Sequence, residues 1–231
     1  MSKIFTLFIA LLLSTPLAAQ TGPDEDQLGM WYMLFFNKSF GDGPFGIQGD
    51  LQYRAWDAGG DMEQLLLRGG LTFRPDDANA LFTLGYGNVT SGAFGDSDAT
   101  SSESRIYQEA LLPHKLSNRF RLTHRFRYEQ RWVENQDFRT RYRYNIFVNV
   151  LLNATEMEKS TLYLALYNEL FINGQTDIGD GRTVERFDRN RTYLGLGYAL
   201  SDDHRVQAGW MRQTTDNWAK SQGQLSLHSR F

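Results

Sequence analysis

The chain has 231 residues, a net charge of −3 and no cysteine. The lack of cysteine excludes a disulfide-stabilised scaffold and a lipid-anchored cysteine. After the first 19 residues no stretch stays apolar for about 18 positions, which excludes a membrane-spanning helix there. A mean hydropathy of −0.46 suits a soluble protein, but the alternating strands of a membrane β-barrel average to similar values.

The N-terminus has the layout of a secretory signal peptide. A lysine near the start precedes an apolar run at 4–13, and Leu-Ala-Ala at 17–19 fits a cleavage site before Gln20. The run is too short for a membrane anchor. We therefore predict a signal peptide at 1–19. We predict a single domain at 20–231, since no linker or repeat divides it.

Alternation of apolar and polar residues then predicts strands, because successive side chains of a strand point to opposite faces. The first segment, 28–38, is apolar on both faces, whereas 45–56 alternates cleanly. Further strands are predicted at 64–74, at 82–86 and, less regularly, at 105–116. The small polar residues of 91–104 predict a long mobile loop.

The most regular pattern lies in two long segments, 119–132 and 138–152, joined by the short polar segment 133–137. This arrangement predicts a hairpin. One face of the hairpin is apolar and aromatic, and the other carries eight arginines. A helix would spread both sets around its surface. The function therefore depends on which face points into the lumen and which face points to the surroundings of the barrel.

The same alternation continues to the C-terminus, with strands predicted at 161–173, 187–200, 205–213 and 223–231. The connections fall into two sets. Those at 116–118, 153–159 and 201–204 lie at one end of the strands, and those at 91–104, 133–137, 174–186 and 215–220 lie at the other. Short periplasmic turns opposite longer external loops are typical of outer-membrane barrels.

Two further features favour a membrane barrel. The chain ends with Leu225, Leu227 and Phe231 in phase on the apolar face, which resembles the terminal strand that the outer-membrane insertion machinery reads. Ser229 departs from that pattern, since its position is usually aromatic or aliphatic. Aromatic residues flank the aliphatic ones along the strands, as in a bilayer. The alternative is a soluble lipocalin-like barrel with the apolar face inward.

The segments add up to eleven strands, which conflicts with the even number that single-chain outer-membrane barrels take. We predict an all-β fold, a single antiparallel transmembrane β-barrel of about twelve strands, with both termini on the periplasmic side. Ten strands are the alternative if 28–38 is not a regular strand.

Four segments carry a family resemblance: RYEQRW at 127–132, NELFIN at 168–173, FDRNRTYLGLGY at 187–198 and WMRQ at 210–213. They resemble recurring blocks of an uncharacterised bacterial family catalogued as domain of unknown function 2490. Arg189 stands where a glutamine is expected. The resemblance implies a barrel in the cell outer membrane of a Gram-negative bacterium, but no activity.

If the apolar face meets lipid, the arginines face the lumen, because a single arginine facing lipid at the midplane costs about 2–4 kcal/mol. We predict a lumen charge belt of Arg125, Arg127, Glu129, Arg131, Arg139, Arg141, Arg143, Glu169, Arg189 and Arg191. Two interpretations follow. Arginine–glutamate pairs can fill a small barrel as packing, or the excess arginine can line an anion-preferring pore.

Catalysis is a third interpretation, as an enzyme acting on lipid or envelope substrates, and a surface-binding protein is a further alternative. The four histidines at 114, 124, 204 and 228 lack the neighbours of a hydrolase site, and His124 falls on the apolar face. No metal-binding, phosphate-loop or paired-acid motif is found, so we expect no catalytic residues, metal or cofactor.

Expected partners are outer-membrane lipids and lipopolysaccharide, the outer-membrane insertion machinery and small anionic solutes. The acidic loops could gather divalent cations with lipopolysaccharide, although such loops are usually only solvated. We expect no nucleic acid, because a signal peptide and acidic loops argue against it.

Overall fold

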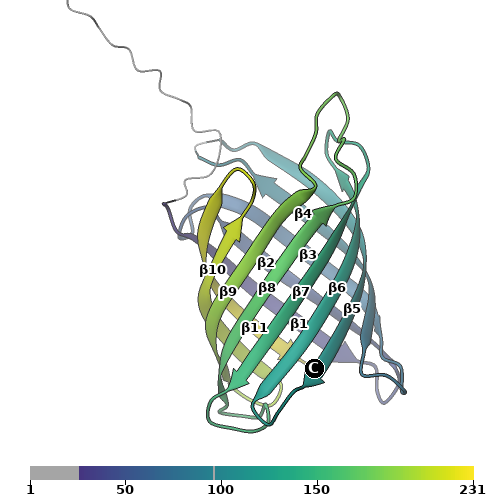
Figure 1. Ribbon diagram of the computed structural model, residues 1–231, viewed down its shortest axis with the longest axis vertical. Coiled ribbons are helices and arrows are strands. Elements are labelled where there is room, and N and C mark those ends of the chain that lie inside the picture. Colours follow the sequence, from purple (N-terminus) through teal and green to yellow (C-terminus); the bar gives the residue numbers. More distant parts are fainter. Residues whose placement is uncertain (1–25, 96) are drawn as a thin grey trace, which may run out of the picture.

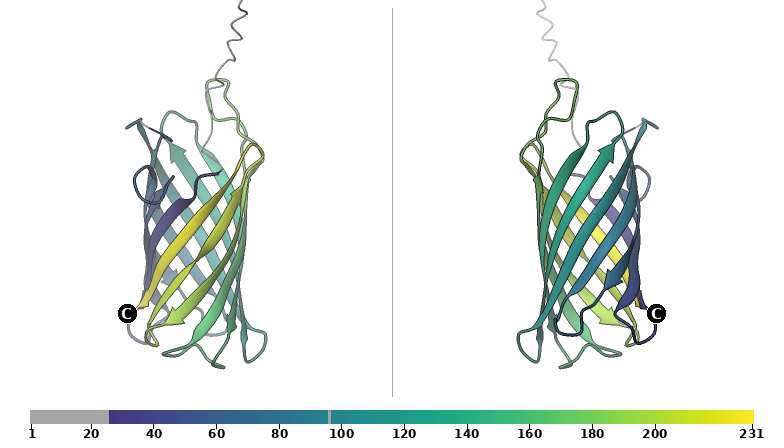
Figure 2. Two further views of the ribbon diagram at one scale, coloured as in Figure 1. Left: turned by 90° about the vertical axis from the view of Figure 1, so that its left-hand side faces the viewer. Right: turned by 90° about the vertical axis from the view of Figure 1, so that its right-hand side faces the viewer.

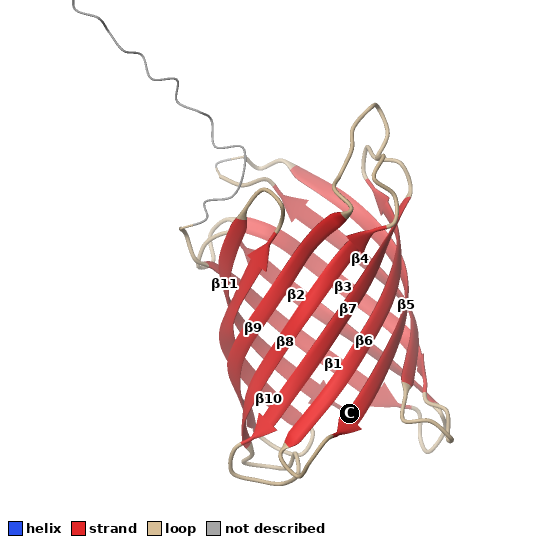
Figure 3. Cartoon of the chain, in the orientation of Figure 1, coloured by secondary structure: helices blue, strands red, loops and turns tan. Residues whose placement is uncertain are grey.

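The computed structural model describes residues 26–95 and 97–231, which form one closed barrel of tilted strands (Figure 1). The predicted signal peptide and its cleavage site lie outside the described residues. The strands are β1 Gly29–Ser39, β2 Phe45–Ala55, β3 Met62–Phe73, β4 Leu81–Gly92, β5 Thr100–Lys115, β6 Phe120–Val133, β7 Arg139–Leu151, β8 Leu162–Asn173, β9 Phe187–Ala199, β10 His204–Thr214 and β11 Ala219–Arg230. Strands and loops make up this whole part of the chain (Figure 3). It contains no helix long and apolar enough to cross a membrane.

The all-β barrel fold is confirmed, and the number of strands in the described chain is eleven rather than twelve or ten. All neighbours are antiparallel except β1 and β11, which pair in parallel from Gly29–Gln222 to Asn37–Arg230. Figure 2 shows β1 in purple beside β11 in yellow. An even number is required only where the first and last strands are antiparallel, and this parallel ladder removes that requirement.

The odd number places the start of β1 and the end of β11 at opposite ends of the barrel, not at one end as predicted. We call the end with the connections 40–44, 74–80, 116–119, 152–161 and 200–203 the turn end. The loop end carries 56–61, 93–99, 134–138, 174–186 and 215–218. The segment 174–186 projects furthest at the loop end in Figure 1.

The segment 91–104, predicted as a mobile loop, is strand at both of its ends. β4 runs to Gly92 and pairs with Thr100, where β5 begins, so only 93–99 connects them. The ladder is extended by the neighbouring hairpin, since the amide of Ser102 donates to the side chain of Glu134 at 3.0 Å. Small polar residues thus form a regular strand here because backbone pairing on both sides supports it.

The two faces of the barrel have opposite characters. Outward side chains are mostly apolar, and Leu71, Leu84 and Leu194 are 63%, 59% and 54% exposed. Inward side chains are mostly polar or charged and are buried. The lipocalin-like alternative required the apolar face to point inward, so the structure excludes it.

Tyrosines on β8 and β9 fill the lumen by lying against inward glycines of β9. A Cβ atom at Gly197 would overlap sterically with the Tyr163 ring, and a Cβ atom at Gly195 would overlap with the Tyr193 hydroxyl. The rings of Tyr167 and Tyr193 stack with centroids 4.9 Å apart. The inward glycines thus make room for the aromatic rings that pack this side of the lumen.

Candidate functional site

Two cavities lie inside the barrel, one above the other. The turn-end cavity has a volume of about 600 Å³ and reaches Asp202 and Asp203 at the turn end. The loop-end cavity has about 180 Å³ and reaches Ser91 and Val133 towards the loop end. Both are lined by the same four arginines, which are Arg54, Arg68, Arg143 and Arg191. The layer that holds these arginines therefore separates the cavities.

This layer, which we call the septum, consists of the four shared arginines together with Trp31 of β1 and Phe171 of β8. The two rings are 2% and 1% exposed. The guanidinium carbon of Arg54 lies 3.8 Å from the centre of the Trp31 ring. Arg191 lies 4.7 Å from both ring centres, and Arg143 lies 4.4 Å from that of Phe171. Cation–π contacts of desolvated arginines are each worth about 2 kcal/mol, so these stacked side chains stabilise one another between the two cavities.

Ion pairs support the septum from one side of the barrel. Glu129 is 0% exposed and accepts hydrogen bonds of 2.6 Å from both Arg141 and Arg143. Arg143 also donates to Glu169 at 2.5 Å, and Arg125 donates to the same carboxylate at 2.7 Å. Each buried acid here is thus shared by at least two arginines, as planar guanidinium groups allow.

The chain of ion pairs continues towards the loop end through Asp188. Arg141 donates to one carboxylate oxygen of Asp188 at 2.7 Å, and Arg189 donates to the other at 3.1 Å. Strict alternation would turn Asp188 outward. A β-bulge between β8 and β9 shifts the register at Phe171, leaving Asp188 as the extra residue. The bulge therefore supplies an acid to the lumen.

Arginine exceeds acid around the loop-end cavity. Nine arginines and one acid, Glu103, line it. Glu103 is already occupied by Arg105 and Arg131, at 2.6 Å and 2.5 Å. Among the described residues, no carboxylate lies within ion-pair distance of Arg54, Arg139 or Arg191. Arginines gathered in a buried cavity produce a strong positive potential.

A family model described as "Protein of unknown function (DUF2490)" matches residues 28–224. The chain belongs to the DUF2490 family. The match begins next to β1 and ends within β11, so the DUF2490 region comprises almost the whole barrel and every residue that lines the loop-end cavity. No curated protein and no solved structure matches the chain. The family membership that four sequence segments indicated is confirmed.

All ten residues of the predicted charge belt point into the lumen of the DUF2490 barrel, but they do not form one ring. Arg125 and Glu169 line the turn-end cavity, whereas Arg131, Arg139, Arg141 and Arg189 line the loop-end cavity. Arg127 pairs with Glu109 of β5 at 2.5 Å. The belt thus extends along the barrel axis as well as around it.

Sequence analysis missed several members of this network in the DUF2490 barrel. They are Trp31, Asp50, Arg54, Arg68, Glu103, Arg105, Glu109, Phe171 and Asp188. Asp50, Arg54 and Arg68 stand on the polar face of cleanly alternating strands, so the period of two could have found them. Glu103 fell in the predicted loop and Asp188 at the bulge, where alternation gives no signal.

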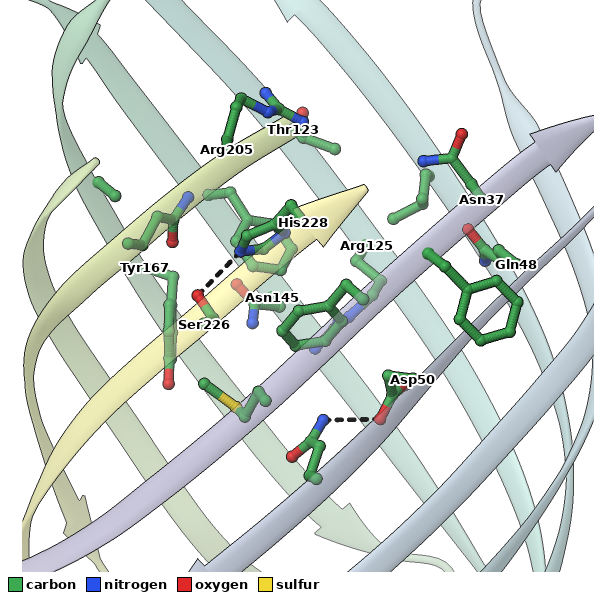
Figure 4. A pocket seen from close by; sticks show the side chains of 18 of the residues that line it. Asn37, Gln48, Asp50, Thr123, Arg125, Asn145, Tyr167, Arg205, Ser226 and His228 are labelled. Atoms are coloured by element: carbon green, nitrogen blue, oxygen red, sulfur yellow. Dashed lines mark hydrogen bonds between the residues drawn. The ribbon is translucent and has the colours of Figure 1, made fainter. Parts of the chain in front are cut away.

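Three of the four histidines in the described part of the DUF2490 protein, His124, His204 and His228, contact hydroxyl groups. His124, on the outer face, contacts the Tyr144 hydroxyl at 2.7 Å, which satisfies one ring nitrogen. His228 lies in the turn-end cavity, contacts Ser226 at 3.0 Å and stacks on Phe35 (Figure 4). Within the described chain no carboxylate is hydrogen-bonded to His228. This serine–histidine pair therefore lacks the third group that orients a catalytic base.

Proposed function

We propose that this DUF2490 protein is an outer-membrane β-barrel whose lumen is closed across its middle, and that it does not serve as a standing pore. The observation that carries the proposal is the inverted arrangement of the barrel wall, apolar outside and charged inside, with the septum across the lumen. The proposed partners are outer-membrane lipids, lipopolysaccharide and the outer-membrane insertion machinery.

The outer face supports a bilayer as the surroundings. Exposed aromatic side chains stand near the turn end of five strands, at Phe45, Phe73, Phe82, Phe120 and Tyr198. On four of these strands exposed leucines follow further from the turn end, at Leu51, Leu71, Leu84 and Leu196. A continuous apolar band of this extent is far larger than the patches that soluble monomers expose. A bilayer satisfies such a band, and an aromatic girdle marks its edge.

The outer face of β8 and β9 becomes polar towards the loop end. On β8 and β9 the Asn168 amide donates to Asn190 at 2.9 Å and to Thr192 at 2.8 Å, and all three side chains point outward. Hydrogen-bonded amides suit water or the headgroup region better than hydrocarbon. We infer that the strands rise beyond the membrane, so that the loop-end cavity stands level with the outer surface or above it.

The septum argues against an open anion pore. An ion crossing it would have to displace arginines that are stacked on Trp31 and Phe171 and paired with buried carboxylates. Removing one partner from a buried ion pair costs about 3–5 kcal/mol, and several such contacts stand in line. A packed lumen of this kind is common in narrow barrels.

The location is tested by membrane fractionation. We expect the protein in the outer-membrane fraction, with an electrophoretic mobility in detergent that changes on heating, as closed barrels show when they unfold. Recovery of the chain as a soluble periplasmic protein would contradict the proposed location.

The closed lumen is tested by conductance in planar bilayers. We expect no steady current from the wild type under a salt gradient, because the septum blocks the path. Replacing both rings, as Trp31→Ala with Phe171→Ala, should produce a current that favours chloride over potassium, because the arginines then line an open path. A wild type that conducts chloride steadily would instead establish the anion pore.

A further inference from the structure

We propose that the loop-end cavity binds one small, doubly charged oxyanion of the phosphate or sulfate type. The inference goes beyond the closed-barrel function and depends only on the geometry of the lumen. It starts from the charges that the protein leaves uncompensated around this cavity.

Arg139 is the clearest of these charges. Its side chain is 8% exposed on β7 and lines the loop-end cavity. Its Nε atom has no hydrogen-bond partner, and no carboxylate of the described chain forms an ion pair with it. A buried cation in this state is strongly unfavourable unless another group compensates it. The side chain is therefore placed to donate to a bound anion.

The acids that line or border the loop-end cavity are already engaged by other arginines. Glu103 is shared by Arg105 and Arg131, and Asp188 is shared by Arg141 and Arg189. On the septum side, Arg54 and Arg191 donate only to glutamine side chains in the described structure. The net charge around the cavity is strongly positive, which favours a doubly charged anion over a singly charged one.

The size of the cavity and its hydrogen-bond donors further restrict the class of anion that it can bind. About 180 Å³ holds roughly six water-sized volumes, at about 30 Å³ each. That space admits a phosphate or sulfate ion with a few waters. Guanidinium forks bind the oxygens of such ions in pairs, a geometry that a chloride ion cannot use. The cavity lies inside the barrel wall, so a free ion fits it and a lipid headgroup does not.

The proposal is tested on the full-length protein, purified from membranes in detergent. Titration with sodium sulfate or sodium phosphate, with ionic strength held constant by sodium chloride, is followed by calorimetry and by the melting temperature. We expect saturable one-to-one binding of both oxyanions and a rise in melting temperature. Acetate at the same ionic strength should have no comparable effect.

The matched variants are Arg139→Gln in the loop-end cavity and Arg205→Gln in the turn-end cavity, which remove the same charge from different places. Loss of one charged hydrogen-bond donor should weaken binding by about tenfold or more for Arg139→Gln. We expect less than a twofold change for Arg205→Gln. Without oxyanion, Arg139→Gln should melt no lower than the wild type, because it removes an uncompensated charge.

Three outcomes would overturn the site: no saturable binding, equal binding of acetate, or equal weakening by both variants. These outcomes are independent of the conductance test, because binding is measured in detergent. A conducting barrel that binds sulfate would refute the closed lumen and leave the anion site intact. A silent barrel that binds no oxyanion would do the reverse.

Discussion

Replacing Glu129 with glutamine is expected to lower the free energy of unfolding by about 3–5 kcal/mol, the range for breaking a buried ion pair by removing one partner. Glu129 is 0% exposed and accepts from Arg141 and Arg143 at 2.6 Å. Glutamine keeps the shape but removes the charge. It can accept from an arginine through one oxygen only, so one of the two guanidinium groups loses its contact at position 129. Asp188 and Glu169 are then left to offset the charges of Arg141 and Arg143 in a dry part of the lumen.

The measurement is equilibrium unfolding by denaturant in detergent, followed by the change in electrophoretic mobility and by tryptophan fluorescence. Glu158→Gln is the matched control, because Glu158 is exposed in the 152–161 connection, and its effect should stay within about 0.5 kcal/mol. Equal stabilities for the two variants would mean that water enters the lumen and screens the pairs, and the packed-lumen interpretation would then be wrong.

Deletion of Phe231 is expected to remove most of the assembled protein from the outer membrane while synthesis continues. The residue is 68% exposed at the turn end, and β11 places Leu225 and Leu227 on the same outer face. Its amide also donates to the carbonyl of Asn37 at 3.0 Å, which ties the last residue to β1. The deletion therefore removes both an exposed terminal aromatic group and a contact at the closing strand pair.

The quantity to compare is the heat-modifiable fraction in isolated outer membranes, relative to total protein made. Phe231→Tyr keeps an aromatic ring and the backbone contact, so it should assemble at the wild-type level. If the deleted form reaches the membrane as efficiently as Phe231→Tyr, the terminal residue is not an assembly signal in this protein.

The alternation of residues predicts the barrel wall well, because the side of each strand follows directly from its period of two. Arg143 lies between Tyr142 and Tyr144, and the structure places the arginine inside and both tyrosines outside. The short connection within the hairpin 119–152 also restricts the register of its two strands, which places Glu129 opposite Arg141. The ion pairs between β6 and β7 can therefore be predicted from the local sequence of this hairpin.

Contacts across the lumen could not be predicted in the same way. Trp31 belongs to a segment that is apolar on both faces, so alternation leaves its direction open. Its contact with Arg191 brings together strands from the two ends of the chain, at heights set by the stagger of the whole barrel. The septum and the second cavity therefore emerge only from the closed structure.

The parallel pairing of β1 with β11 has a consequence for how the barrel can form. Every other ladder joins strands that follow one another along the chain, so the other ten pairings are hairpins. The eleventh joins segments separated by almost the whole described chain. The entropy lost in bringing distant segments together therefore falls on this single seam. Parallel ladders are also slightly less stable per residue than antiparallel ones. The pairing of β1 with β11 is therefore the least stable strand pairing of the barrel.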